Sequence, residues 1–99
     1  MRRKVRLSDR AKQNQFEIWY YIAQDNIGAA DRLASRLTEV YLLLSENPEA
    51  GPSKPHLGDG IRTFTVSGHV ICYRVTPDAI EVVAVFHGAR NITRRLLEE

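Results

Sequence analysis

The chain has 99 residues, 43% of them hydrophobic, and a formal net charge of +2. A chain of this length can bury one modest core without a metal ion or disulfides, so we expect a single domain over residues 1–99. Cys72 is the only cysteine, which excludes an intrachain disulfide and a multi-cysteine metal site. The basic start of the chain runs into polar residues rather than a signal-peptide segment, and no stretch is long and apolar enough to cross a membrane. We therefore expect a cytoplasmic protein.

Positive charge is concentrated near the two ends of the sequence. The basic residues there are Arg2, Arg3, Lys4, Arg6, Arg90, Arg94 and Arg95. If the termini lie close together in the fold, these side chains form one basic patch, which suits an acidic partner or phosphate groups. Two separate, solvated basic ends are the alternative.

The first elements are a short strand and a helix. Charged and apolar residues alternate from Lys4 to Leu7, which favours a strand, and Ser8 is suited to cap a helix from about Asp9 to Gln24. Within this helix the residues at helical spacing are Phe16, Trp19, Tyr20 and Ala23. We interpret this aromatic stripe as core. Truncation of Trp19 to alanine should then cost on the order of 3–5 kcal/mol.

A second amphipathic helix follows a break at residues 25–28. Its apolar residues are Ala30, Leu33, Leu37, Val40, Tyr41 and Leu44, which predict a helix from about Ala29 to Ser45. Because the break is short, the two helices should form an antiparallel hairpin. Asn47 and Pro48 end the second helix, and the segment Pro48 to Gly60, rich in proline and glycine, is a loop that contains a solvated His56.

The rest of the chain has β-forming composition. Strands are predicted at Ile61 to Val66, His69 to Val75 and Ile80 to His87, joined by turns at residues 67–68 and 76–79. A short terminal helix or ordered tail follows at Asn91 to Leu97. The fold class is therefore α+β in the order β-α-α-β-β-β, with the helix hairpin packed on an antiparallel meander because each layer alone would leave an apolar face in water.

Candidate chemistry is limited to a basic and aromatic set on or beside the sheet. No nucleophile motif surrounds Cys72, which we interpret as a buried structural thiol, and no glycine-rich phosphate loop precedes a helix, so no cofactor is expected. The remaining candidates are Arg62, His69, Tyr73, Arg74, His87 and Arg90. Each also has an ordinary structural explanation. A guanidinium, a phenol and an imidazole that converge on an open sheet face could nevertheless hold RNA phosphates and transfer protons.

Strand register decides which of these residues share a face. A two-residue turn at positions 67–68 pairs Arg62 with Tyr73 on one face and turns Arg74 to the other. Across the second turn, a two-residue loop places Val82 opposite Tyr73. One more loop residue places Val83 there and brings His87 to the Arg62/Tyr73 face.

Several short sequence segments, in order over nearly the whole chain, resemble segments of the RelE/ParE toxins of type II toxin–antitoxin systems. The segments are residues 7–11 (LSDRA), 18–23 (IWYYIA), 46–51 (ENPEAG), 60–64 (GIRTF), 73–75 (YRV) and 85–90 (VFHGAR). Together they resemble the ParE-like branch, which is associated with poisoning of DNA gyrase. The ribonuclease branch cleaves messenger RNA on the ribosome with basic residues on the concave sheet face and a tyrosine or histidine near the C-terminus.

The chain departs from the ribonuclease pattern. Val70 lies early in the middle strand, where some nuclease members carry a catalytic arginine, and no tyrosine follows Tyr73. The resemblance thus implies a gyrase inhibitor that acts by binding. A ribosome-dependent messenger-RNA endonuclease, using Arg62, Tyr73, His87 and Arg90, and a non-toxic antitoxin-binding module are the alternatives.

The resemblance also implies a partner, a cognate ParD-like antitoxin that forms a tight hetero-oligomer and alone contacts operator DNA. Its apolar helix could occupy the helix-hairpin groove and its strand the sheet edge. Candidate contacts with the target or the antitoxin are Arg62, Tyr73, Arg74, His87, Arg90, Arg94 and Arg95.

Overall fold

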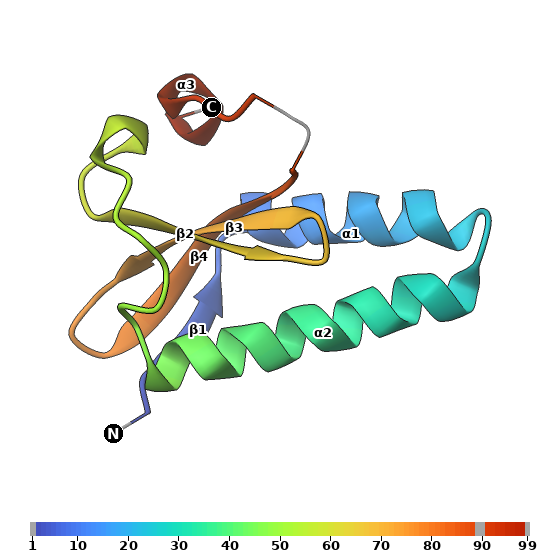
Figure 1. Ribbon diagram of the computed structural model, residues 1–99, viewed down its shortest axis with the longest axis horizontal. Helices are drawn as coiled ribbons and strands as arrows, with labels where there is room; N and C mark the ends of the chain where they lie inside the picture. The colour runs from blue at the N-terminus through green and yellow to red at the C-terminus, as the bar shows by residue number, and fades with distance from the viewer. Residues whose placement is uncertain (1, 89–90, 99) are drawn as a thin grey trace.

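The computed structural model describes residues 2–88 and 91–98, and it confirms the α+β class and the expected order of elements. Two helices lie on a four-stranded sheet, and a short third helix lies beyond the opposite side of the sheet (Figure 1). The elements are β1 (Lys4–Leu7), α1 (Asp9–Ala23), α2 (Ile27–Glu46), the 3₁₀ helix η1 (Pro55–Leu57), β2 (Ile61–Val66), β3 (His69–Val75), β4 (Ala79–His87) and α3 (Arg94–Glu98).

The sheet has the strand order β1-β4-β3-β2. The three later strands form the expected antiparallel meander, whereas β1 runs parallel to β4, with Val5 opposite Ile80. The first strand therefore occupies an edge of the sheet beside the last strand. Beyond Val82, the open side of β4 is covered by the start of α1, because the Ser8 hydroxyl donates to the Val83 carbonyl at 2.7 Å and the Asn14 side chain accepts from the Val85 amide at 3.1 Å.

Side-chain caps set the helix boundaries. Ser8 caps α1 as expected, its Oγ accepting a hydrogen bond from the Ala11 amide at 3.0 Å. Asn26 caps α2 in the same way, accepting from the Ala29 amide at 2.9 Å, so this helix begins at Ile27, two residues before the predicted start. An asparagine side chain that accepts from the first free amides of a helix fixes where the helix starts.

The two turns of the meander differ in regularity. Ser67 and Gly68 both have positive φ values, 49° and 77°, as a two-residue type I′ turn requires. The predicted pairing of Arg62 with Tyr73 is confirmed. Across the second turn Tyr73 lies opposite Val82, but the register shifts between Cys72 and Tyr73, so Cys72 faces Ala84 and His69 faces His87. A bulge at Val83 thus combines features of both predicted registers.

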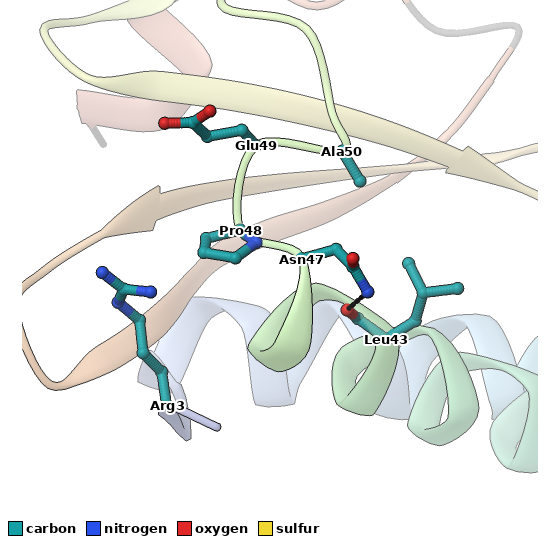
Figure 2. Close-up of a pocket in the computed structure, with 6 residues that line it drawn as sticks. All are labelled: Arg3, Leu43, Asn47, Pro48, Glu49 and Ala50. Atoms are coloured by element: carbon teal, nitrogen blue, oxygen red, sulfur yellow. Dashed lines mark hydrogen bonds between the residues drawn. The ribbon is translucent and has the colours of Figure 1, made fainter. Parts of the chain in front are cut away.

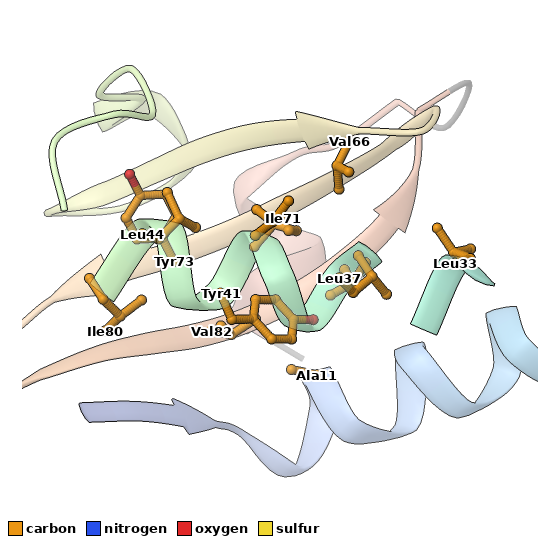
Figure 3. Packing of buried hydrophobic residues seen from close by; sticks show 12 residues of the cluster. Ala11, Leu33, Leu37, Tyr41, Leu44, Val66, Ile71, Tyr73, Ile80 and Val82 are labelled. Atoms are coloured by element: carbon orange, nitrogen blue, oxygen red, sulfur yellow. The ribbon is translucent and has the colours of Figure 1, made fainter. Parts of the chain in front are cut away.

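The main core lies between the helix hairpin and the sheet. Figure 3 shows Leu37, Tyr41 and Leu44 of α2 packed against Ile71, Tyr73 and Val82 of the sheet, with Ala11 of α1 at one side. All of these side chains are buried. Their burial supplies the main apolar contribution to stability.

A second, smaller cluster covers the other face of the sheet. Cys72, Ala84 and Phe86 are buried there, and Ile92, Leu96 and Leu97 of the C-terminal segment pack against them. Cys72 is a buried structural thiol, as expected, and burial raises the pKa of this thiol to about 11. The sheet therefore has apolar residues on both faces.

The prediction that the aromatic stripe of α1 belongs to the core was wrong. Phe16 and Tyr20 are 57% and 55% exposed, and Trp19 is half-buried, its indole N–H donating to Asp31 at 2.9 Å. The helix instead turns Ile18 and Ile22 toward the main core. Residues two positions apart lie about 200° apart around a helix, so the faces of Phe16 and Ile18 are nearly opposite. Both faces carry apolar residues, and periodicity alone does not distinguish them.

Candidate functional site

Arg62 and Tyr73 hold the loop that follows α2. Tyr73 is fully buried, and its hydroxyl donates to the Pro48 carbonyl at 2.8 Å and accepts from the Gly51 amide at 2.9 Å. The Arg62 guanidinium donates to the Gly51 carbonyl at 2.8 Å. Two of the candidate side chains thus bind the backbone of residues 48–51. We call Arg62, Tyr73 and this loop segment together the loop clamp.

The surroundings of the loop clamp leave little room for a substrate. A Cβ atom added to Gly51 would overlap the Thr63 carbonyl and come within 2.8 Å of the Tyr73 hydroxyl. Burial raises the pKa of Tyr73 above its usual value, although the Gly51 amide and the Arg62 charge oppose the shift. A phenol with a raised pKa remains protonated at neutral pH, and it is a poor general base.

His87 lies at the other end of the sheet, beside His69. The two rings meet edge to face, with centroids 5.5 Å apart and an interplanar angle of 88°. His69 is buried, and its Nδ1 lies 3.0 Å from the Ser67 carbonyl. Because a carbonyl only accepts hydrogen bonds, this contact favours the tautomer with the proton on Nδ1.

The loop clamp and the histidine pair are on the same side of the sheet, facing the helices, but they do not meet. Tyr73 and His69 are four residues apart on β3, which corresponds to about 13 Å at the usual rise of a strand. The shared face is also covered by α1 and α2 rather than open. The structure therefore does not bring Arg62, Tyr73 and His87 together.

The other candidate residues are dispersed. Arg74 is exposed on the opposite face of the sheet, where its Nε donates to the Asp59 carbonyl at 3.2 Å. Arg94 pairs with Glu98 at 3.6 Å on α3, and Arg95 is exposed beside it. Arg90 lies outside the residues that the structure describes.

The basic residues at the start of the chain have local partners. Arg2 pairs with Glu46 at 2.7 Å and Arg6 with Asp78 at 3.1 Å. Figure 1 shows the start of the chain and α3 on opposite sides of the molecule. The described basic residues of the two ends therefore form separate surfaces, and two of the four at the start of the chain are paired with carboxylates.

An open cleft of about 590 Å³ lies between the end of α2 and the loop clamp (Figure 2). It is lined by Arg3, Leu43, Asn47, Pro48, Glu49 and Ala50. The Asn47 side chain donates to the Leu43 carbonyl at 3.1 Å, and Arg3 donates through Nε to the Thr76 carbonyl at 3.0 Å. These polar groups are engaged with the backbone, so the cleft offers little chemistry beyond one cation and one carboxylate.

A groove between the helix hairpin and the end of the sheet that carries the β2–β3 turn has more charged and apolar side chains. It consists of two cavities of about 470 and 420 Å³, which share Ile22 and His69. Its lining residues are Glu17, Ile18, Tyr21, Ile22, Ala29, Arg32, Leu33, Arg36, Ser67, His69 and His87. We call this the histidine groove. It combines an apolar floor with two arginines and two imidazoles against a single carboxylate.

The sequence reasoning missed two surface features. Arg32 and Arg36 lie four residues apart on α2, so their spacing placed them on one helix face, but nothing in the sequence placed that face beside His69. The exposed aromatic residues of α1 were assigned to the core. The ring centroid of Phe16 lies 6.5 Å from that of Trp19 and 6.0 Å from that of Tyr20. The three aromatic side chains thus form a ridge on α1.

Within residues 2–88 and 91–98, no group of three or more histidine, cysteine, aspartate or glutamate residues is placed to hold a metal ion. In the same part of the chain, none of the helices has the length and apolar character needed to span a membrane.

The sequence and the fold are both similar to those of proteins from toxin–antitoxin systems. A sequence model described as the ParE toxin of the type II toxin–antitoxin system parDE matches residues 5–92. No curated protein matches the chain. The fold is similar to a solved structure titled as a chromosomal ParDE toxin–antitoxin system from P. aeruginosa, with a TM-score of 0.71 and 17% identity, covering 86% of this chain and 95% of the other. It is also similar to the RelBE2 toxin–antitoxin complex from Mycobacterium tuberculosis, with a TM-score of 0.66, 17% identity, and 88% and 99% coverage.

Proposed function

Because the chain belongs to the ParE toxin family of type II toxin–antitoxin systems, we propose that it acts by binding and inhibiting DNA gyrase and is neutralised by a cognate antitoxin. In this proposal the chain is a binding protein rather than a catalyst. The proposed target is an intracellular enzyme, so the proposal also places the chain in the cytoplasm.

The observation that carries the proposal is the character of the sheet face turned away from α1 and α2. Val70, Cys72, Ala84 and Phe86 occupy its centre, beneath the C-terminal segment. General acid–base cleavage of RNA needs titratable groups within hydrogen-bond reach of the reacting atoms. The centre of this face offers only the buried thiol of Cys72, whose pKa is raised to about 11, and Tyr73 points to the other side of the sheet into the main core. These features favour a binder over a ribonuclease.

The test is a supercoiling assay with purified gyrase, relaxed plasmid and the free chain. We expect supercoiling to be inhibited, and inhibition to persist in a His87→Ala variant, since no acid–base step is involved. Undiminished supercoiling at a large excess of folded chain would contradict the proposal. Cleavage of translated messenger RNA that is lost in His87→Ala would instead identify an endonuclease, and inactivity in both assays with retained antitoxin binding would identify a non-toxic module.

For the antitoxin we propose a segment with apolar and acidic side chains that lies in the histidine groove. Arg32 and Arg36 are exposed at its rim, and the partly buried Ile18 and Ile22 line its floor. Charge complementarity of this kind guides association and fixes the register of a bound segment. Operator DNA would then be contacted through the antitoxin rather than by this chain.

Charge reversal tests the proposed groove. In co-purification with the product of the reading frame beside the toxin gene, Arg32→Glu and Arg36→Glu should weaken the complex, with an effect that grows at low salt. Lys12→Glu is the matched control, because this residue is exposed on the same hairpin outside the groove. Equal effects of all three reversals would indicate only a general effect of net charge.

A further inference from the structure

The C-terminal helix α3 depends entirely on contacts with the rest of the fold. It has five residues, none of them buried, and its ion pair between Arg94 and Glu98 joins side chains that are 55% and 67% exposed. Isolated helices shorter than about 12 residues are marginal in water even with favourable sequences. The helix must therefore form where it docks rather than by its own propensity.

The short helix α3 lies against η1 and is otherwise held by apolar side chains and one hydrogen bond. Ile92, Leu96 and Leu97 are partly buried against the small cluster on the outer sheet face. On the polar side, the Arg10 guanidinium of α1 donates to the Leu96 carbonyl. The main core, in contrast, is built from buried side chains of α1, α2 and the sheet and includes no residue of α3. The two parts of the molecule thus have separate sets of stabilising contacts.

From these contacts we propose that residues 91–98 form a detachable cover, which opens as a unit while the helix hairpin and the sheet remain folded. Proteins open locally with free energies that range from near zero up to that of global unfolding, and segments with few buried contacts are at the low end. Opening uncovers an apolar strip of the sheet formed by Val70, Cys72, Ala84 and Phe86. The chain then has a closed state and an open state that present different surfaces.

This cover controls access to the strip. A reagent reaches the strip only in the open state, so its rate of reaction there is scaled by the fraction of molecules that are open. Any change that loosens α3 raises that rate without altering the strip itself. The inference does not depend on gyrase or on the antitoxin, because it concerns only the contacts within this chain.

Cys72 reports on the opening, since it is the only cysteine of the chain and is fully buried beneath the cover. The experiment is alkylation of the native full-length chain with iodoacetamide near pH 8, in which the thiolate sulfur forms a bond to carbon and iodide leaves. Mass spectrometry gives the rate of labelling, and urea unfolding followed by Trp19 fluorescence gives the global stability. We expect labelling to be much faster than global unfolding allows and to depend little on low concentrations of urea.

Two variants loosen the cover by different contacts, and one serves as control. Leu96→Ala removes apolar contact and Arg10→Gln removes the bond to the Leu96 carbonyl, and each should raise the labelling rate about tenfold with little change in global stability. Ile22→Ala removes a partly buried side chain of the main core, so it should lower global stability and leave the labelling rate unchanged. Labelling that follows global stability across all three variants would overturn the proposal.

Discussion

Replacing Tyr73 with phenylalanine tests whether this residue is a structural clamp or a functional group. The substitution removes only the hydroxyl, which accepts from the Gly51 amide at 2.9 Å and donates to the Pro48 carbonyl at 2.8 Å. Ring volume is preserved, so no cavity forms in the core. The Gly51 amide, which is buried with its residue, is left without this acceptor. Stranding a buried donor costs about 1–3 kcal/mol, so we expect a loss of about 2 kcal/mol.

Thermal and urea unfolding measure this loss directly. For a domain of about 100 residues, a loss of about 2 kcal/mol lowers the Tm by roughly 10 °C. Tyr21→Phe is the matched control, because this side chain is 76% exposed and its hydroxyl should contribute little. Arg62→Met should show coupling to Tyr73→Phe in a double-mutant cycle, since both side chains bind Gly51. Unchanged stability with complete loss of toxicity would refute the reasoning and make Tyr73 a functional group.

The remaining predictions concern side-chain burial and charge. Trp19→Ala should cost only about 1–2 kcal/mol in urea unfolding, because the indole is half-buried, whereas Leu44→Ala should cost about 2–5 kcal/mol. Burial raises the pKa of Cys72 to about 11 and that of Tyr41 to about 12. These folded-state values lie above the usual ones of 9.0 and 10.0, so the stability they contribute is intact at lower pH and is lost as the pH rises through 11 and 12. When the free energy of unfolding is measured across this pH range, the Tyr41→Phe variant should lack the part of the decrease that occurs as the pH approaches 12. Arg6 holds the pKa of the Asp78 carboxyl below its usual value, so Arg6→Gln should raise that pKa in an NMR titration.

Local signals in the sequence predicted most of the fold. Ser8 supplied a cap, the residues 67–68 supplied a two-residue turn, and the alternation of apolar residues supplied the strands. The pairing of β1 with β4 was not predicted, because parallel pairing between distant segments leaves no local mark in the sequence. The bulge at Val83 was not predicted either, since the strand around it is apolar on both faces and gives no periodic signal.

The candidate site was less accessible to sequence reasoning than the fold. Arg62 and Tyr73 were correctly paired, but their hydrogen bonds go to the backbone of residues 48–51, and a loop of prolines and glycines gives no indication of where it will fold. The histidine groove joins residues from α1, α2 and two strands, so its composition became visible only with the tertiary structure. The exposed aromatic ridge shows that an apolar stripe identifies an amphipathic helix without identifying which face is buried.

The parallel pairing of β1 with β4 has a consequence for the order of events during synthesis. Val5 finds its partner only when Ile80 has been added to the chain, and the hydroxyl of Ser8 finds its acceptor only at Val83. The chain must lose the entropy of closing a long loop before these contacts can stabilise it, and this cost slows folding. The segments of the helix hairpin are therefore made before the strands that cover their apolar side. The sheet of this fold is therefore incomplete until the residues of β4 have been added to the chain.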